Sequence, residues 1–173
     1  MGTQPQSSEA EPVAALYRQA LPQVFGYLLP RCGSTAVAED LTAETFMAAV
    51  AAVKAGGVPD LTVAWLVGVA RHKLADHWRR VAREEQRLAA VADLTAAAAT
   101  DPWPELLDAG AAYAALARLS APQRAALTLR YLDGLPVAEV AGYLGRSERA
   151  TETLLVRARA ALRAIYQEEG GDD

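Results

Sequence analysis

Apolar side chains recur at three- and four-residue spacing along most of the chain, which is the period of an α-helix with one buried face. The first run predicts a helix over residues 12–29, in which Pro22 introduces a kink or a break. Ser34 is a candidate N-cap for a second helix that ends near Lys54. No strand-like alternation competes with these runs, so the pattern favours an all-α fold.

A third, long helix is predicted after a short loop, with Asp60 or Thr62 as its cap and a span of residues 61–83. Its early turns are apolar nearly all round, whereas its later turns are polar and basic. Such a helix is expected to be buried at its start and exposed at its end.

After about residue 88 the composition shifts to Ala, Thr, Asp and Pro, which is typical of a linker. Helical patterns then resume and predict four helices, over residues 106–119, 122–132, 136–144 and 147–166. We therefore predict two small helical domains joined by a flexible acidic linker, the C-terminal domain containing a helix-turn-helix. The predicted parts are a disordered N-terminus (1–10), a first domain (11–90), the linker (91–104), a second domain (105–168) and an acidic tail (169–173).

Charge is distributed unevenly along this sequence of 173 residues with a formal net charge of −4. Residues 71–87 carry six basic and three acidic side chains, and residues 118–163 carry eight basic and four acidic ones. Between them, residues 88–117 hold four acids and no base. Because salt screens charges beyond about 8 Å, a phosphate responds to the local sign. Two basic blocks flanking an acidic connector thus indicate a nucleic-acid partner.

The segment LPVAEVAGYLGRSERATETLLVRARAAL matches a helix-turn-helix, with a glycine-bearing turn between two helices. In its second helix an apolar stripe is formed by Thr151, Leu155, Ala158 and Leu162. The opposite side carries polar residues suited to a major groove near the helix start and to phosphates further on. The alternative is an ordinary helical hairpin with a solvated arginine face.

Two further segments carry candidate chemistry. In WLVGVARHKLADHWRR, Trp78 lies within a basic helix and is able to stack on an unpaired base, but a surface helix with a Trp buried at one edge fits equally well. In AEDLTAETF, the acids form either a solvated face or a docking site for a basic partner helix. The single cysteine, Cys32, is expected to be a small buried residue. No catalytic, metal or cofactor motif is found, so we expect neither an enzyme nor a bound cofactor.

These three segments, in this order, resemble the bacterial RNA polymerase sigma factors of the extracytoplasmic-function (ECF) class, over residues 11–90 and 105–166. The resemblance implies that AEDLTAETF docks on core RNA polymerase through Glu39, Asp40, Leu41 and Glu44. The family usually has a glutamine where this chain has Ala43. The resemblance also implies that the acidic linker threads polymerase channels normally occupied by nucleic acid.

The resemblance further implies two DNA-binding surfaces on promoter DNA. The minus-ten element would be melted by Asp60, Thr62, Arg71, His72, Lys73, Trp78, Arg79 and Arg80. The minus-thirty-five element would be bound by Arg146, Ser147, Arg149, Glu152, Thr153, Arg157 and Arg159. The chain departs from the family at His72, often Asn, and at Glu152 and Leu154, commonly Lys and Arg.

The resemblance implies an anti-sigma factor as a further partner, and it predicts initiation of transcription at selected promoters. The N-terminal MGTQPQSSEAEP lacks the features of a secretory signal, and no apolar run is long enough to cross a bilayer, so we expect a cytoplasmic protein without membrane insertion. Two alternatives remain open. A stand-alone helix-turn-helix regulator would bind duplex DNA without polymerase, and a helical adaptor would bind only proteins.

Overall fold

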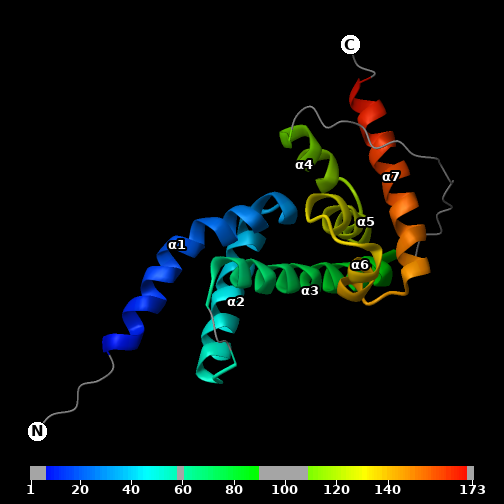
Figure 1. The fold of residues 1–173 in the computed structure, drawn as a ribbon. Coiled ribbons are helices and arrows are strands. Elements are labelled where there is room, and N and C mark those ends of the chain that lie inside the picture. The colour runs from blue at the N-terminus through cyan, green and yellow to red at the C-terminus, as the bar shows by residue number, and fades with distance from the viewer. Residues whose placement is uncertain (1–6, 58–60, 90–108, 171–173) are drawn as a thin grey trace, which may run out of the picture. The chain divides into compact units, whose positions relative to one another are not determined.

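The computed structural model describes residues 7–57, 61–89 and 109–170, and all regular structure in these ranges is helical, as predicted (Figure 1). The helices are α1 (Ser7–Cys32), α2 (Thr35–Lys54), α3 (Val63–Ala89), α4 (Ala109–Ala117), α5 (Ala121–Leu127), the π-helical turn η1 (Thr128–Leu132), α6 (Val137–Leu144) and α7 (Glu148–Gly170). The helix α1 begins inside the segment predicted to be disordered, of which residues 1–6 lie outside the described ranges. The linker 91–104 and the tail segment 171–173 also lie outside them.

Two compact units make up the chain, residues 1–74 and residues 75–173. The boundary between them falls within α3, so the first half of this helix belongs to the first unit and the second half to the second unit. The domain limits deduced from the sequence stay a prediction.

The first unit is built on α1 and α2, which pack against each other, and on the start of α3. Its fully buried side chains include Val24, Leu28 and Leu66. Ser34 caps α2, since its Oγ accepts a hydrogen bond from the amide of Val37 at 3.5 Å. The predicted second helix and its cap are thus confirmed.

Pro22 does not break the first helix, because α1 continues through it to Cys32. A proline removes one backbone donor and leaves the carbonyl four residues earlier without its helical partner. Pro22 and Arg18 are both exposed, so water can donate a hydrogen bond to the Arg18 carbonyl in place of the missing amide of Pro22. The helix therefore continues through the proline. Cys32 is buried, as expected.

In the second unit, α5 packs on α7, and α6 packs on both of them. The buried side chains of Leu127, Leu129 and Val140 fill the space between these helices. The helix predicted over 122–132 is confirmed, but its last turn is π-helical: the amide of Asp133 donates to the carbonyl of Thr128 at 3.0 Å. A π-turn accommodates one more residue than an α-turn.

Candidate nucleic-acid interface

The turn between α6 and α7 is set by Gly145, which has a left-handed backbone with φ of 63°. The amide of Arg146 donates to the carbonyl of Ala141 at 3.0 Å, and the amide of Gly145 donates to the carbonyl of Gly142 at 3.3 Å. These bonds satisfy the last carbonyls of α6, a common way to end a helix at a glycine. Ala141 is buried, so its small side chain lets α6 and α7 approach closely, as predicted.

The start of α7 is capped by Ser147, whose Oγ accepts a hydrogen bond from the amide of Ala150 at 3.2 Å. The inner stripe of α7 matches the prediction, since all four of its members are buried: Thr151, Leu155, Ala158 and Leu162. The outer side is exposed at every predicted groove position, namely Arg146, Ser147, Arg149, Glu152 and Thr153. The helix-turn-helix therefore presents one polar face and buries the other.

The cations of α7 differ in how they are engaged. Arg146, Arg149 and Arg157 are exposed, and none of the three forms an ion pair within the described ranges. Arg159 is half-buried and donates from Nη1 to the hydroxyl of Tyr131 at 2.8 Å. Arg159 is therefore tied to the π-helical turn, whereas the other three guanidinium groups face solvent.

Trp78 is buried, with only 2% of its surface exposed. Of the two interpretations left open by the sequence, the structure shows the Trp enclosed at one edge of the helix. A ring must be uncovered to stack on a base, so the predicted contact with DNA requires a rearrangement around Trp78. The indole Nε1 is buried and has no hydrogen-bond partner in the described part of the chain.

The basic side chains of α3 lie among acceptors. Arg79 pairs with Asp76 one turn earlier, and Arg80 donates toward Nδ1 of His77 at 3.2 Å. Lys73 lies 3.6 Å from the carboxylate of Glu44 on α2.

The other predicted minus-ten residues are distributed along the same helix. Arg71 is half-buried and His72 is exposed. Thr62 caps α3, since its Oγ1 accepts a hydrogen bond from the amide of Trp65 at 3.2 Å. Asp60 lies outside the described residues.

The acidic segment lies on α2, where Glu39 and Asp40 are exposed. Leu41 does not belong to this surface, because its side chain is only 2% exposed and forms part of the core. The reason is its position on the helix: Leu41 shares the inward face with Ala38 and Thr45, which are fully buried. Leu41 thus packs in the core of the first unit, whereas Glu39 and Asp40 face solvent.

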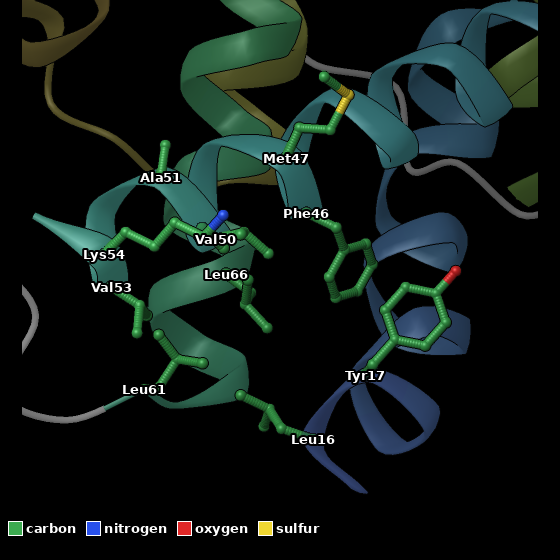
Figure 2. A pocket seen from close by; sticks show the side chains of 11 residues that line it. Leu16, Tyr17, Phe46, Met47, Val50, Ala51, Val53, Lys54, Leu61 and Leu66 are labelled. Carbon is green, nitrogen blue, oxygen red and sulfur yellow. The ribbon is translucent and has the colours of Figure 1, made fainter. Parts of the chain in front are cut away.

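An apolar hollow of about 620 Å³ opens beside α2 in the first unit (Figure 2). Tyr17 and Phe46 lie next to each other on one side of it, with ring centroids 4.6 Å apart, and Leu61 and Leu66 line another side. Met47 beside it is 71% exposed, a large fraction for an apolar side chain. This surface was not predicted from the sequence.

Three side chains that form hydrogen bonds between separate helices were not predicted from the sequence, namely Arg124, Tyr131 and Glu85. Arg124 donates to the carbonyls of Leu116, Ala117 and Leu119 and so closes the junction between α4 and α5. Tyr131 accepts a hydrogen bond from Arg159, which lies 28 positions later in the chain. Glu85 accepts one from the amide of Ala121, which lies 36 positions later. Contacts of such separation leave no periodic signal in the sequence.

No group of three His, Cys, Asp or Glu side chains able to hold a metal ion occurs among the described residues. Within those same ranges, no helix is both long and apolar enough to span a membrane. The arrangement described above, with a capped helix-turn-helix in the second unit and an acidic helix in the first, defines a helical DNA-binding protein.

Two family models match the chain, "Sigma-70 region 2" over residues 16–84 and "Sigma-70, region 4" over residues 109–162. The chain therefore belongs to the sigma-70 family and, by its relatives, to the ECF RNA polymerase sigma factors, which are promoter-recognising transcription initiation factors. The resemblance deduced from the sequence is confirmed.

Among its relatives is the ECF RNA polymerase sigma factor BldN of Streptomyces coelicolor, 34% identical over 95% of this chain. The chain spans 64% of that protein's length. The ECF sigma factor SigF of Caulobacter vibrioides is 36% identical over 86% of this chain and 84% of its own. Among solved structures, the sigma factor RpoE of Bartonella quintana, in complex with the anti-sigma factor NepR, matches with a TM-score of 0.54 and 25% identity. That match covers 87% of this chain and 94% of RpoE.

Proposed function

We propose that this chain binds core RNA polymerase in the cytoplasm, directs it to a subset of promoters and helps to open the duplex, with no catalytic activity of its own. The observation that carries the proposal is the outer face of α7, where the exposed guanidinium groups of Arg146, Arg149 and Arg157 follow one another from the capped helix start onward and form no ion pair within the described residues. Such a face combines groove-reading donors with phosphate-binding charge.

The first two turns of α7 read the minus-thirty-five element. Arg146, Ser147, Arg149 and Thr153 supply donors to base edges, and Glu152 accepts a hydrogen bond from cytosine N4. Arg157, which lies further along α7 and is exposed, binds phosphate. Arg159 contributes to phosphate binding only after it exchanges its hydrogen bond to Tyr131 for one to the DNA.

The helix α3 melts the minus-ten element. Arg71, Lys73, Arg79 and Arg80 hold the separated strand, and Trp78 stacks on a base once its ring is uncovered. The resemblance to the family supports a contribution of His72, Thr62 and Asp60 to the same element.

Core RNA polymerase docks on the exposed side of α2. Five exposed residues follow one another at alternating spacings of three and four: Asp40, Ala43, Met47, Val50 and Lys54. This is the spacing with which one helix packs along another. A partner helix with a basic end would face Asp40, Glu39 and Glu44, while its apolar part would cover Met47 and the hollow beside it.

An anti-sigma factor is a further partner. RpoE of Bartonella quintana was solved in complex with such a factor, NepR, and this chain shares its fold. The exposed apolar side chains of the first unit offer an inhibitor a surface that would compete with the polymerase.

The test is to mix the purified chain with core RNA polymerase and to measure co-elution and initiation from a promoter selected by the holoenzyme. We expect both, and we expect Glu44→Lys to abolish co-elution while Glu84→Lys, the same change on exposed α3, does not. Tight binding to duplex DNA without polymerase would instead support a stand-alone regulator. Activity that survives charge reversal of Arg149 and Arg157 would support a protein-binding adaptor.

A further inference from the structure

The apolar hollow beside α2 reaches from the surface of the first unit down to its core (Figure 2). Its walls come from α1, α2 and the segment that leads into α3. Ala49 and Leu66 line it and are buried, whereas Met47 and Val53 line it and are exposed. Its volume of about 620 Å³ lies within the roughly 300–1,000 Å³ that small-molecule sites occupy. The hollow is therefore a concave site rather than a flat apolar patch.

Among the described residues that line the hollow, one carries a charge: Lys54, in the last turn of α2. Lys54 is exposed and forms no ion pair within the described part of the chain. The hydroxyl of Tyr17 points away from the hollow (Figure 2). An ammonium group at the rim of an apolar cavity favours a ligand with an apolar body and an anionic head.

The end of α2 does not oppose an anion at Lys54. A helix normally presents free carbonyls at its C-terminus, and their partial charge repels anions. Here the carbonyls of Ala51, Ala52 and Val53 accept hydrogen bonds from the amides of the following turn, at 3.1, 3.2 and 2.9 Å. Their negative charge is thus partly compensated, and the ammonium group dominates the local field.

We propose that this hollow binds a lipophilic anion, a small molecule whose apolar body enters the cavity and whose carboxylate pairs with Lys54. The lining suits an alkyl chain, because the flexible side chain of Met47 adapts to the shape of what it covers. The formal net charge of −4 disfavours anions over the molecule as a whole. Selective binding of an anion therefore requires the local charge of Lys54.

The same ligand would regulate the chain, and this second part of the proposal rests on the proposed function. Met47, Val50 and Lys54 line the hollow and also belong to the surface of α2 that we assign to core RNA polymerase. A molecule seated in the hollow occupies part of that surface. Ligand and polymerase therefore compete, and occupancy of the hollow lowers the amount of holoenzyme.

Calorimetric titration of the purified chain with alkyl carboxylates of increasing length, each below its micelle-forming concentration, tests the cavity. We expect the affinity to rise about fourfold for each added methylene, the equivalent of about 0.8 kcal/mol, and to stop rising once the hollow is full. A cavity of finite size sets this limit, whereas adsorption to an exposed patch does not. Absence of binding, or an affinity that rises without a limit, would overturn the proposal.

The head group tests the role of Lys54. Decanoate and decylammonium have nearly the same apolar body, and the net negative charge of the chain favours the cation in non-specific binding. We expect the parent chain to prefer decanoate by less than about fivefold, since an exposed ion pair contributes little. We expect Lys54→Glu to reverse the preference, and Arg18→Glu, exposed on α1 outside the lining, to keep it. The same preference in all three chains would show that Lys54 does not hold the ligand.

Filling variants locate the ligand. Leu16→Phe and Val53→Phe enlarge side chains that line the hollow, so we expect each to shorten the alkyl chain at which the affinity stops rising. Val53 is exposed, so its variant keeps the fold even if Leu16→Phe disturbs packing. Leu88→Phe, the same change at an exposed position of α3, is the control. An unchanged limit in both filling variants, or a dimer that decanoate does not dissociate, would overturn the proposal.

Co-elution with core RNA polymerase tests the competition. We expect saturating decanoate to reduce co-elution of the parent chain, and to leave that of Val53→Phe unchanged because its hollow is filled. Co-elution of the parent chain that saturating decanoate does not reduce would overturn the regulatory part. A chain that fails to co-elute even without decanoate would show instead that the proposed function is wrong, while calorimetric binding of decanoate would still support the site.

Discussion

The two basic helices differ in what surrounds their cations. On α3, Lys73, Arg79 and Arg87 each lie beside a carboxylate of the chain, and Arg80 lies beside His77. At the start of α7, Arg146 and Arg149 have no such partner within the described ranges. The number of arginines in the two sequence blocks does not reveal this difference.

The difference separates two ways of binding DNA. The α7 surface is ready for the major groove, because its charges face water and lose only hydration on binding. The α3 surface must first exchange its own acceptors for phosphates, and Trp78 must be uncovered. Recognition of duplex DNA by α7 is therefore expected to precede strand capture by α3. The following variants test this comparison, from the largest expected effect to the smallest.

Leu155→Ala tests whether the buried face of α7 stabilises the fold of the second unit and so holds the exposed face in position. Leu155 is 5% exposed, so its truncation leaves a cavity and we expect a loss of about 2–5 kcal/mol in the free energy of unfolding. Leu88→Ala on α3 is the control, because Leu88 is 69% exposed and its loss costs little. Chemical denaturation of the two variants measures the difference, and equal midpoints would contradict the packing of α7.

Arg149→Glu tests the readiness of the α7 surface. We expect promoter affinity of the holoenzyme to fall by roughly 1–3 kcal/mol, the range for loss of a good contact to a base edge. Arg18→Glu, an exposed residue of α1, carries the same change in charge and serves as the control. Filter binding at fixed salt compares them, and a similar loss in both would indicate a general charge effect instead of a local contact.

Arg157→Ala and Arg159→Ala compare two cations of α7 that differ in their contacts within the chain. Arg157 is exposed and free to bind phosphate, whereas Arg159 already donates to Tyr131. Loss of one phosphate contact is expected to reduce the slope of log affinity against log salt by about 0.9. We expect that reduction for Arg157→Ala and a smaller one for Arg159→Ala. Titrations at four salt concentrations measure the slopes, and the reverse order would show that the Tyr131 bond does not engage Arg159 in solution.

Asp76→Asn removes the carboxylate that pairs with Arg79. The guanidinium group of Arg79 then faces solvent without this ion pair, as those of Arg146 and Arg149 do within the described ranges. Because an exposed ion pair contributes at most about 1 kcal/mol, we expect capture of a single-stranded minus-ten oligonucleotide by the holoenzyme to improve by less than about fivefold. Glu84→Gln changes the net charge equally but releases Arg87, which lies outside the assigned surface. An equal gain in both variants would mean that total charge, and not Arg79, limits capture.

The periodic parts of the fold could be predicted from the sequence, because each rests on local information. The caps Ser34 and Ser147 and the inner stripe of α7 follow from residue type and spacing over a few turns. Continuation of α1 through Pro22 could not be predicted, since it depends on whether the freed carbonyl reaches water.

The contacts at the candidate site were less accessible to sequence reasoning. Burial of Trp78 depends on α5 and the helix-turn-helix, more than forty residues later in the chain. Leu41 looked like part of an acidic docking motif, and only its position on the inward face of α2 removes it from that surface. The partner of Arg159 is a tyrosine 28 residues earlier, brought there by the packing of the second unit.

The widened turn Thr128–Leu132 has a consequence for how this chain could change over evolutionary time. Deleting one residue there would restore α-helical pitch and rotate Tyr131 by about 100° around the helix axis. The phenol would then no longer accept the hydrogen bond from Arg159 Nη1, although no residue of α7 itself is substituted. A change of one residue in the length of this turn would thereby alter the hydrogen bonding of a cation on α7, a helix that lies later in the chain.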